Sequence, residues 1–112
     1  MNVLIVDDNA QVRRVIRASI EDYVQGIVEC DSGEQAVNSY AKYQPDWILM
    51  DLQMAGGDGV NATRILKTMF PEARVVIVTS HDSVPLRKAA TAAGAHAYIL
   101  KEDLYQLRTI LR

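Results

Sequence analysis

The chain has 112 residues, which is enough for one domain and leaves little room for a second. Its net charge is −2 and no basic stripe appears, which argues against direct binding of nucleic acid. No apolar stretch approaches the roughly 20 residues of a membrane span, and the N-terminus carries no export signature. The single cysteine, Cys30, rules out an internal disulfide. We therefore expect one cytoplasmic domain over residues 1–112, with neither a membrane nor nucleic acid as a direct partner.

Short apolar runs alternate with helical patterns five times along the chain. Each apolar run has the length of a strand, and each helical pattern repeats its apolar residues every three or four positions. The expected strands cover residues 2–7, 27–30, 46–51, 74–79 and 97–100. The expected helices cover 9–21, 32–42, 59–69, 84–93 and 103–111.

Residues suited to helix ends stand beside most of these ranges. Asp8 or Asn9 can cap the first helix, and Asp31 or Ser32 can cap the second. Between the third strand and the third helix, residues 53–58 read as a loop. Additional end signals are Asp58 as a cap, Pro85 in a first turn and Gly94 at a C-terminal cap.

The strands predict the fold class. Continuous apolar runs are typical of strands buried on both faces, and such strands form parallel sheets. Strands and helices that alternate in this way imply right-handed crossovers with helices on both faces of the sheet. We therefore predict an α/β fold, a flavodoxin-like (βα)5 doubly wound five-stranded parallel sheet of order 2-1-3-4-5.

Polar residues follow four of the five expected strands. Asp7 and Asp8 come at the end of the first strand and Asp51 at the end of the third. Thr79 ends the fourth strand, and Lys101 follows the fifth. Because the carboxyl ends of parallel strands meet at one edge of the sheet, we expect these side chains to share one pocket. An acidic pocket with one lysine and one hydroxyl suits a divalent cation and a phosphoryl group.

An aspartate carboxylate is a nucleophile that can form an acyl phosphate, provided that a cation offsets the repulsion from the phosphoryl group. Mg²⁺ takes oxygen ligands and bridges carboxylates to phosphate oxygens. We expect Asp7, Asp8 and Asp51 to bind Mg²⁺, and the backbone carbonyl of Gln53 could complete the protein ligands. Lys101 and Thr79 would then hold the phosphoryl oxygens.

The chain resembles the receiver domain of bacterial two-component response regulators over essentially its whole length. The resemblance implies that Asp51 is the phosphoacceptor and that Asp7 and Asp8 bind Mg²⁺. It also implies that Thr79 and Lys101 sense the phosphoryl group. The motifs that carry it are Val6-Asp7-Asp8-Asn9, Pro45 to Met54, Asp58-Gly59, Val78-Thr79-Ser80, Gly94-Ala95 and Tyr98-Ile99-Leu100-Lys101.

The same resemblance suggests further roles and partners. Tyr98 would act with Thr79 as the conformational switch, although an aromatic residue in a strand is often only a packing residue. Gln53 and His81 would tune the rates of phosphorylation and hydrolysis. The phosphoryl donor would be a sensor histidine kinase or a histidine phosphotransfer protein. A downstream protein, an output domain after Arg112 or a second copy of the chain would read the switch.

Several positions depart from the usual family pattern in ways that bear on kinetics and partners, and two alternatives to the switch stay open on other grounds. Ala55 and Gly57 stand where the family often has proline and a larger residue, so we expect a loose loop at 55–57. Glu102 replaces a common proline. One alternative is a receiver-like interaction module that does not use phosphorylation. The other is a magnesium-dependent phosphatase, which Gln53 disfavours because such enzymes carry a second aspartate there. A receiver catalyses only its own phosphorylation and dephosphorylation and is not a metabolic enzyme.

Overall fold

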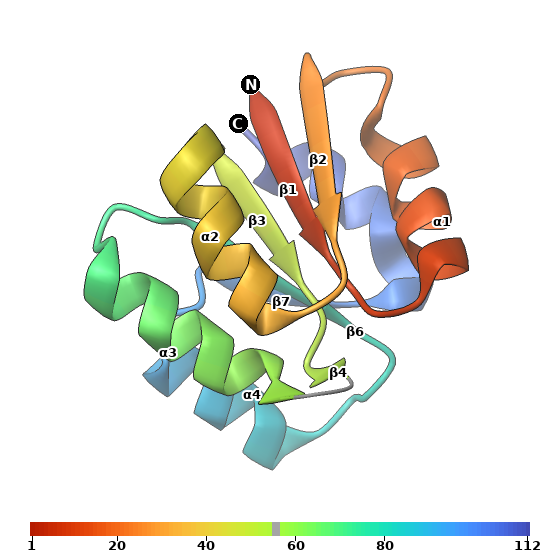
Figure 1. Ribbon diagram of the computed structural model, residues 1–112. Helices are drawn as coiled ribbons and strands as arrows, with labels where there is room; N and C mark the ends of the chain where they lie inside the picture. Colours follow the sequence, from red (N-terminus) through yellow and green to blue (C-terminus); the bar gives the residue numbers. More distant parts are fainter. Residues whose placement is uncertain (55–56) are drawn as a thin grey trace.

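The computed structural model describes residues 1–54 and 57–112 and has the predicted parallel sheet (Figure 1). The strand order β2-β1-β3-β6-β7 corresponds to the predicted 2-1-3-4-5, because two short strands outside this sheet take the labels β4 and β5. All four pairings within the sheet are parallel. The strands are β1 (Asn2–Val6), β2 (Gly26–Cys30), β3 (Trp47–Met50), β6 (Val75–Thr79) and β7 (Ala97–Leu100).

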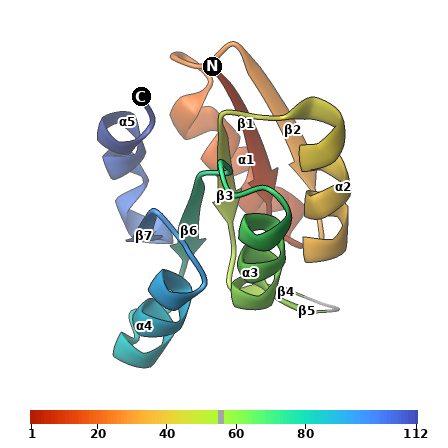
Figure 2. The same cartoon turned by 90° about the vertical axis from the view of Figure 1, so that its left-hand side faces the viewer.

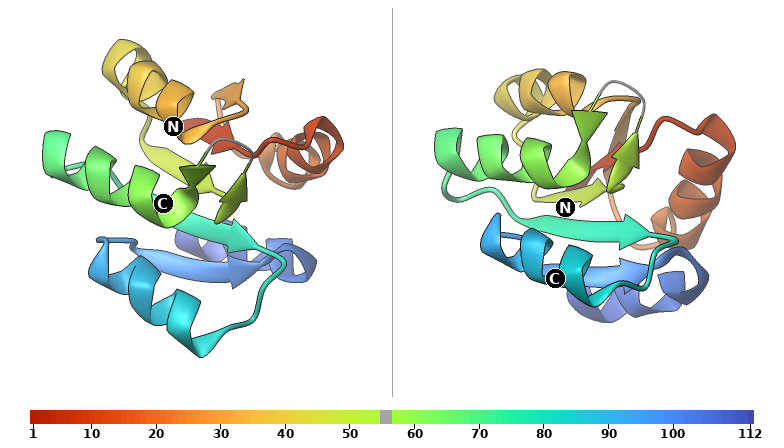
Figure 3. Two further views of the ribbon diagram at one scale, coloured as in Figure 1. Left: turned by 60° about the horizontal axis from the view of Figure 1, so that its bottom comes forward. Right: turned by 90° about the horizontal axis from the view of Figure 1, so that it is seen from below.

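Helices cover both faces of the sheet (Figure 1, Figure 3). One face packs on α2 (Gly33–Tyr43), α3 (Gly59–Met69) and α4 (Val84–Ala92). The other face packs on α1 (Ala10–Ile20) and α5 (Leu107–Ile110). No helix in the described part of the chain is both long enough and apolar enough to cross a membrane.

Each strand contributes alternate side chains to two separate cores. Leu4 packs into the core beneath α2 and α3, whereas Val3 and Ile5 pack into the core beneath α1 and α5. In the same way Ile48 faces the first core and Leu49 the second. This alternation explains why the strands are apolar throughout, since successive side chains point to opposite faces and both faces are covered.

The helix ends select among the predicted caps. The Asn9 side chain accepts hydrogen bonds from the backbone N–H groups of Gln11 and Val12, so Asn9 rather than Asp8 caps α1. The hydroxyl of Ser32 caps α2. Asp58 caps α3 as predicted. Gly94 follows α4 with a φ of 103°, a left-handed conformation that glycine adopts without strain.

Two segments, residues 53–58 and residues 101–110, differ from the sequence-based prediction. The loop predicted at 53–58 contains an antiparallel pair, β4 (Gln53–Met54) and β5 (Gly57–Asp58), which lies beyond the carboxyl ends of the large sheet (Figure 2). The looseness predicted for the loop at 55–57 falls mainly on residues 55 and 56, which lie outside the described residues.

The last predicted helix, 103–111, is replaced by two shorter pieces. A 3₁₀ helix, η1 (Lys101–Gln106), begins immediately after β7, and α5 follows it. The 3₁₀ segment is itself kinked at Asp103, whose φ of −114° and ψ of 34° are not helical. The short helix still buries Leu107 against the sheet, which is the role that its apolar spacing suggested.

Candidate functional site

Three carboxylates meet at the carboxyl edge of the sheet. One oxygen each from Asp7, Asp8 and Asp51 lies within 4.8 Å of the others. The two strands concerned are neighbours, and the N–H of Asp51 donates to the carbonyl of Val6 at 3.0 Å. Asp7 and Asp51 are only 1% and 6% exposed, whereas Asp8 is exposed. The predicted acidic pocket is therefore present, with two of its three carboxylates buried.

Lys101, which follows the edge strand β7, brings a positive charge to this cluster. Its Nζ lies 3.0 Å from Oδ2 of Asp7 and 3.5 Å from Oδ1 of Asp51. The lysine follows the last residue of β7, Leu100, which pairs with Thr79 at the end of β6. The side chain reaches two strands that are not adjacent to its own, and it links the two buried carboxylates.

The environment of Asp51 disfavours its charged form. Burial raises the pKa of the Asp51 carboxyl, and the neighbouring Asp7 raises it further. Lys101 and the backbone N–H of Leu52, which donates to Oδ1 of Asp51 at 2.9 Å, lower this pKa but do not cancel the rise. A carboxylate held at this cost is stabilised by any cation that enters the pocket.

The cluster fits a magnesium ion by its donors. All three side chains offer carboxylate oxygens, the ligands that Mg²⁺ prefers. Oδ1 of Asp7 accepts a hydrogen bond from the N–H of Asn9 at 2.9 Å, which orients the carboxylate. Oδ2 of Asp7 is buried and faces Lys101 as an ion pair, but it accepts no hydrogen bond from the described residues. The fourth predicted ligand is the backbone carbonyl of Gln53. This residue begins β4, and its side chain is exposed.

The structure joins Thr79 and Tyr98 to the same residue. Thr79 is fully buried at the end of β6, and its hydroxyl accepts a hydrogen bond from the backbone N–H of His81 at 3.3 Å. The hydroxyl of Tyr98 donates to the carbonyl of His81 at 2.5 Å. The guanidinium of Arg87 lies 4.4 Å from the centre of the Tyr98 ring. The His81 side chain itself is exposed.

Two residues around the site were not identified from the sequence. A Cβ on Gly59 would overlap the carbonyl oxygen of Asp51 and lie 3.0 Å from Cα of Leu52, so only glycine fits there. The Asp58-Gly59 pair at the predicted helix start was the available signal. The other residue is Arg13, whose Nη1 donates to the backbone carbonyl of Asp7 at 2.6 Å.

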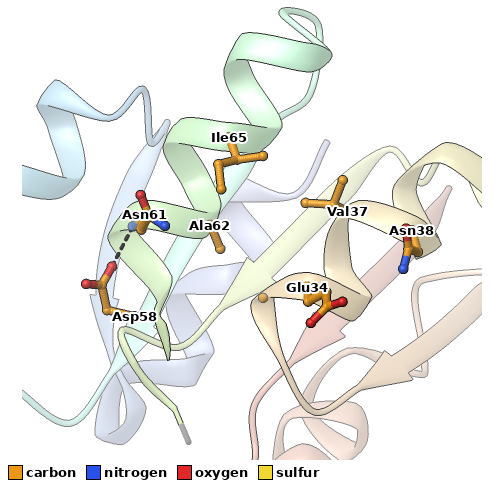
Figure 4. A pocket seen from close by; sticks show the side chains of 8 residues that line it. Glu34, Val37, Asn38, Asp58, Asn61, Ala62 and Ile65 are labelled. Atoms are coloured by element: carbon orange, nitrogen blue, oxygen red, sulfur yellow. Dashed lines mark hydrogen bonds between the residues drawn. The ribbon is translucent and has the colours of Figure 1, made fainter. Parts of the chain in front are cut away.

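One surface hollow lies away from the acidic cluster and a second lies beside it. The first, of about 360 Å³, lies between α2 and α3 and is lined by Glu34, Val37 and Ile65 among others (Figure 4). None of the three clustered carboxylates lines it. A second hollow, of about 280 Å³, lies between α1 and η1 and includes Asn9 and Lys101 in its wall, so it adjoins the acidic cluster.

Comparisons with known proteins agree with this geometry. Residues 3–112 match the family model of the response regulator receiver domain. Chemotaxis protein CheY of Halobacterium salinarum is 35% identical over 99 residues, which cover 88% of this chain and 82% of CheY. Transcriptional regulatory protein DegU of Brevibacillus brevis is 33% identical over 104 residues, which cover 91% of this chain and 44% of DegU. The chain thus spans most of one relative and less than half of the other.

A solved structure shows the same fold. The BeF₃-activated N-terminal receiver domain of Klebsiella pneumoniae RstA has a TM-score of 0.89 and 29% sequence identity, and the match covers 100% of this chain and 99% of that one. The chain belongs to the response-regulator receiver domain family, and its function is that of a phosphoryl-accepting receiver in two-component signalling. Receivers of this family are signalling switches rather than metabolic enzymes.

Proposed function

We propose that Asp51 is the phosphoacceptor of one receiver domain formed by residues 1–112, and that its donor is a phosphohistidine of a sensor histidine kinase or a histidine phosphotransfer protein. The observation that carries this proposal is the buried Asp51 carboxylate, which lies between two further carboxylates and Lys101. Oδ1 of Asp51 is already engaged by Leu52 and Lys101. The other oxygen, Oδ2, is therefore the expected nucleophile.

In the transfer, an oxygen of Asp51 attacks the phosphorus atom while the phosphorus–nitrogen bond of the donor breaks. The donor histidine keeps the electron pair of that bond, and Asp51 becomes an acyl phosphate. Lys101 places its ammonium group beside the transferred oxygens, and Thr79 offers a hydroxyl donor. Negative charge on the phosphoryl oxygens is thereby held by fixed groups of the chain, which is the usual design for phosphoryl transfer.

Asp7, Asp8, Asp51 and the backbone carbonyl of Gln53 would hold Mg²⁺. When bound, the ion supplies positive charge that offsets the repulsion between the carboxylates and the incoming phosphoryl group. The support for this assignment is the all-oxygen cluster, in which the carboxylates of Asp7 and Asp51 are buried side by side.

The chain would also catalyse its own dephosphorylation, in which water hydrolyses the acyl phosphate on Asp51 and releases inorganic phosphate. The side chains of Gln53 and His81 are exposed near the carboxyl edge of the sheet. We expect them to affect the access of that water and to tune the rates of phosphorylation and hydrolysis. Because the phosphoryl group stays on the protein between the two steps, the domain acts as a timed switch.

Thr79 and Tyr98 would carry the switch. A Thr79 hydroxyl that turns to donate to the phosphoryl group gives up its place beside the N–H of His81, and this change reaches Tyr98 through the His81 carbonyl. Partners that contact the surface around Tyr98 would read the difference. We propose that a downstream protein, an output domain beyond Arg112 or a second copy of the chain binds this surface.

The proposed location is the cytoplasm. A single buried cysteine suits a reducing compartment, so we place the protein in the cytoplasm.

Incubation with acetyl phosphate and Mg²⁺, followed by intact-mass measurement, tests the proposal. We expect one added phosphoryl group on the wild type, dependent on Mg²⁺, and none on Asp51→Asn. No adduct on a folded wild-type protein would instead favour the interaction module. Rapid multiple-turnover release of phosphate without an adduct would favour the phosphatase.

A further inference from the structure

Arg13 connects the acidic cluster to a small ion-pair network on the outside of the sheet. Its Nη1 donates to the backbone carbonyl of Asp7 at 2.6 Å, and its Nε donates to Oε1 of Glu29 at 3.0 Å. The other carboxylate oxygen of Glu29 accepts from Nε of Arg17 at 2.8 Å. The network therefore spans α1, the edge strand β2 and the end of β1.

The burial of this network separates it from an ordinary surface ion pair. The side chains of Arg13 and Glu29 are only 18% and 28% exposed, whereas those of the Arg108–Asp22 pair are 62% and 63% exposed. Exposed pairs contribute little because solvent screens them and their long side chains lose freedom. Partly buried pairs in which one carboxylate accepts from two guanidinium groups hold a more definite geometry.

We infer, on the basis of the function proposed above, that Arg13 is a positioning residue for the magnesium site and that Glu29 holds Arg13 in place. The Arg13 guanidinium donates to the backbone carbonyl of Asp7. This carbonyl belongs to the peptide group that joins Asp7 to Asp8, two of the expected metal ligands. The N–H of Asp7 is fixed on the other side by the carbonyl of Cys30 at 3.2 Å. Both peptide groups that flank the Asp7 side chain are thereby anchored. Partners that orient metal ligands from outside commonly change metal affinity by about tenfold or more.

A positioning role and a simple charge effect predict opposite results. Arg13 is a positive charge beside a cation site, so its removal would strengthen Mg²⁺ binding if charge alone acted. If Arg13 positions the ligands, its removal weakens binding although the local charge becomes more favourable. Arg14, the next residue on α1, is exposed and makes no hydrogen bond or ion pair with the described residues. Arg14→Gln is therefore a control with the same change of charge on the same helix.

The experiment measures the Mg²⁺ dissociation constant from the backbone amide shifts of Asp8 in NMR titrations, with the urea midpoint of each variant recorded beside it. We expect Arg13→Gln to weaken Mg²⁺ binding about tenfold. Arg13→Lys should weaken it too, because an ammonium group cannot donate to Asp7 and Glu29 with the geometry of a guanidinium. Arg14→Gln should bind as tightly as the wild type or slightly more tightly.

Glu29→Gln keeps the shape of the side chain and carries the same test if Arg13→Gln does not fold. Its binding should be weakened less than that of Arg13→Gln, and the double variant should bind no more weakly than Arg13→Gln alone, because both changes act through one contact. Unchanged or tighter Mg²⁺ binding in folded Arg13→Gln or Glu29→Gln would overturn the positioning role and leave the magnesium site intact. A wild-type protein without Mg²⁺-dependent shifts would overturn the magnesium site itself, and this inference with it.

Discussion

The hydroxyl groups of Thr79 and Tyr98 are joined through the backbone of one residue, His81. Its N–H donates to the Thr79 hydroxyl at 3.3 Å, and its carbonyl accepts from the Tyr98 hydroxyl at 2.5 Å. A movement of Thr79 toward a phosphoryl group therefore has a direct route to Tyr98. A ligand shifts such an equilibrium only through contacts that differ between the two states, and in the proposed switch the Thr79 hydroxyl would supply that difference.

Thr79→Ala should separate phosphorylation from the switch. We expect the variant to accept a phosphoryl group on Asp51 and yet to show little change at Tyr98 when beryllofluoride is added. His81→Ala should switch like the wild type, since the link runs through the backbone of His81 and not through its exposed side chain. NMR signals of the Tyr98 ring, recorded with and without beryllofluoride, give the comparison. Equal shifts in Thr79→Ala and the wild type would show that Thr79 is not the link.

Asp51→Asn should stabilise the metal-free protein, and the gain should depend on pH. Burial, followed by the Asp7 carboxylate, raises the pKa of Asp51 above that of an aspartate in an unfolded chain, which is about 3.9. The native state therefore binds the proton more tightly. The stability that this gives is fully present below the unfolded pKa and is lost as the pH rises through the native pKa.

Urea unfolding of both proteins at about pH 4 and at about pH 7, without Mg²⁺, measures this effect. We expect Asp51→Asn to exceed the wild type by more at the higher pH, where the wild-type carboxyl is ionised. Titrating groups away from the cluster are shared by the two proteins, so the difference between their unfolding free energies reports Asp51 and its coupling to Asp7 and Lys101. An equal difference at both pH values would contradict the raised pKa.

Gly59→Ala should destabilise the fold and disturb the phosphoacceptor. The added methyl group would overlap the carbonyl oxygen of Asp51, a backbone atom that cannot turn aside. Overpacking of this kind costs about 1–3 kcal/mol of unfolding free energy. Gly26→Ala is the matched control, because its methyl group would meet the Oδ1 atom of Asn2, the end of an exposed and flexible side chain. A Gly59→Ala variant as stable as Gly26→Ala would show that α3 can shift freely beneath Asp51.

Magnesium should stabilise the wild-type protein more than Asp8→Ala. A ligand that binds only the native state raises the unfolding free energy by RT ln(1 + [L]/Kd), so weaker binding gives a smaller rise. Removal of one carboxylate from the cluster should weaken binding and reduce the rise in melting temperature at millimolar Mg²⁺. Glu34→Ala, which removes an exposed carboxylate from α2, should respond like the wild type. A wild-type melting temperature that ignores Mg²⁺ would count against the site.

The parts of the site that could be predicted are those that follow directly from the strands. Parallel strands buried on both faces appear as continuous apolar runs, so the residues after them, such as Asp7, Asp51 and Lys101, could be placed at one edge. The network around Arg13 could not be placed in this way. Glu29 is a charged residue within an apolar strand, which signals a partner, but several arginines were available and only the packed structure selects Arg13 and Arg17.

The C-terminal segment shows a different limit. Apolar residues at Leu104, Leu107 and Ile110 are spaced by three, and this spacing fits a 3₁₀ helix as well as an α-helix. The sequence therefore indicated a buried helical face without indicating which helix presents it. The kink at Asp103 lies between Lys101, which pairs with the Asp7 carboxylate, and Leu107, which packs against the sheet. Such a junction is set by tertiary contacts and not by local periodicity.

In the proposed function the phosphoryl group resides on Asp51 as an acyl phosphate. Borohydride reduces an acyl phosphate to an alcohol, so the phosphorylated aspartate becomes homoserine and is marked permanently. After incubation with acetyl phosphate and Mg²⁺, reduction, digestion and peptide mass spectrometry should find homoserine at position 51 and at neither Asp7 nor Asp8. Homoserine at position 7 or 8, or at no position in a protein that has gained phosphoryl mass, would show that Asp51 does not carry the phosphoryl group as an acyl phosphate.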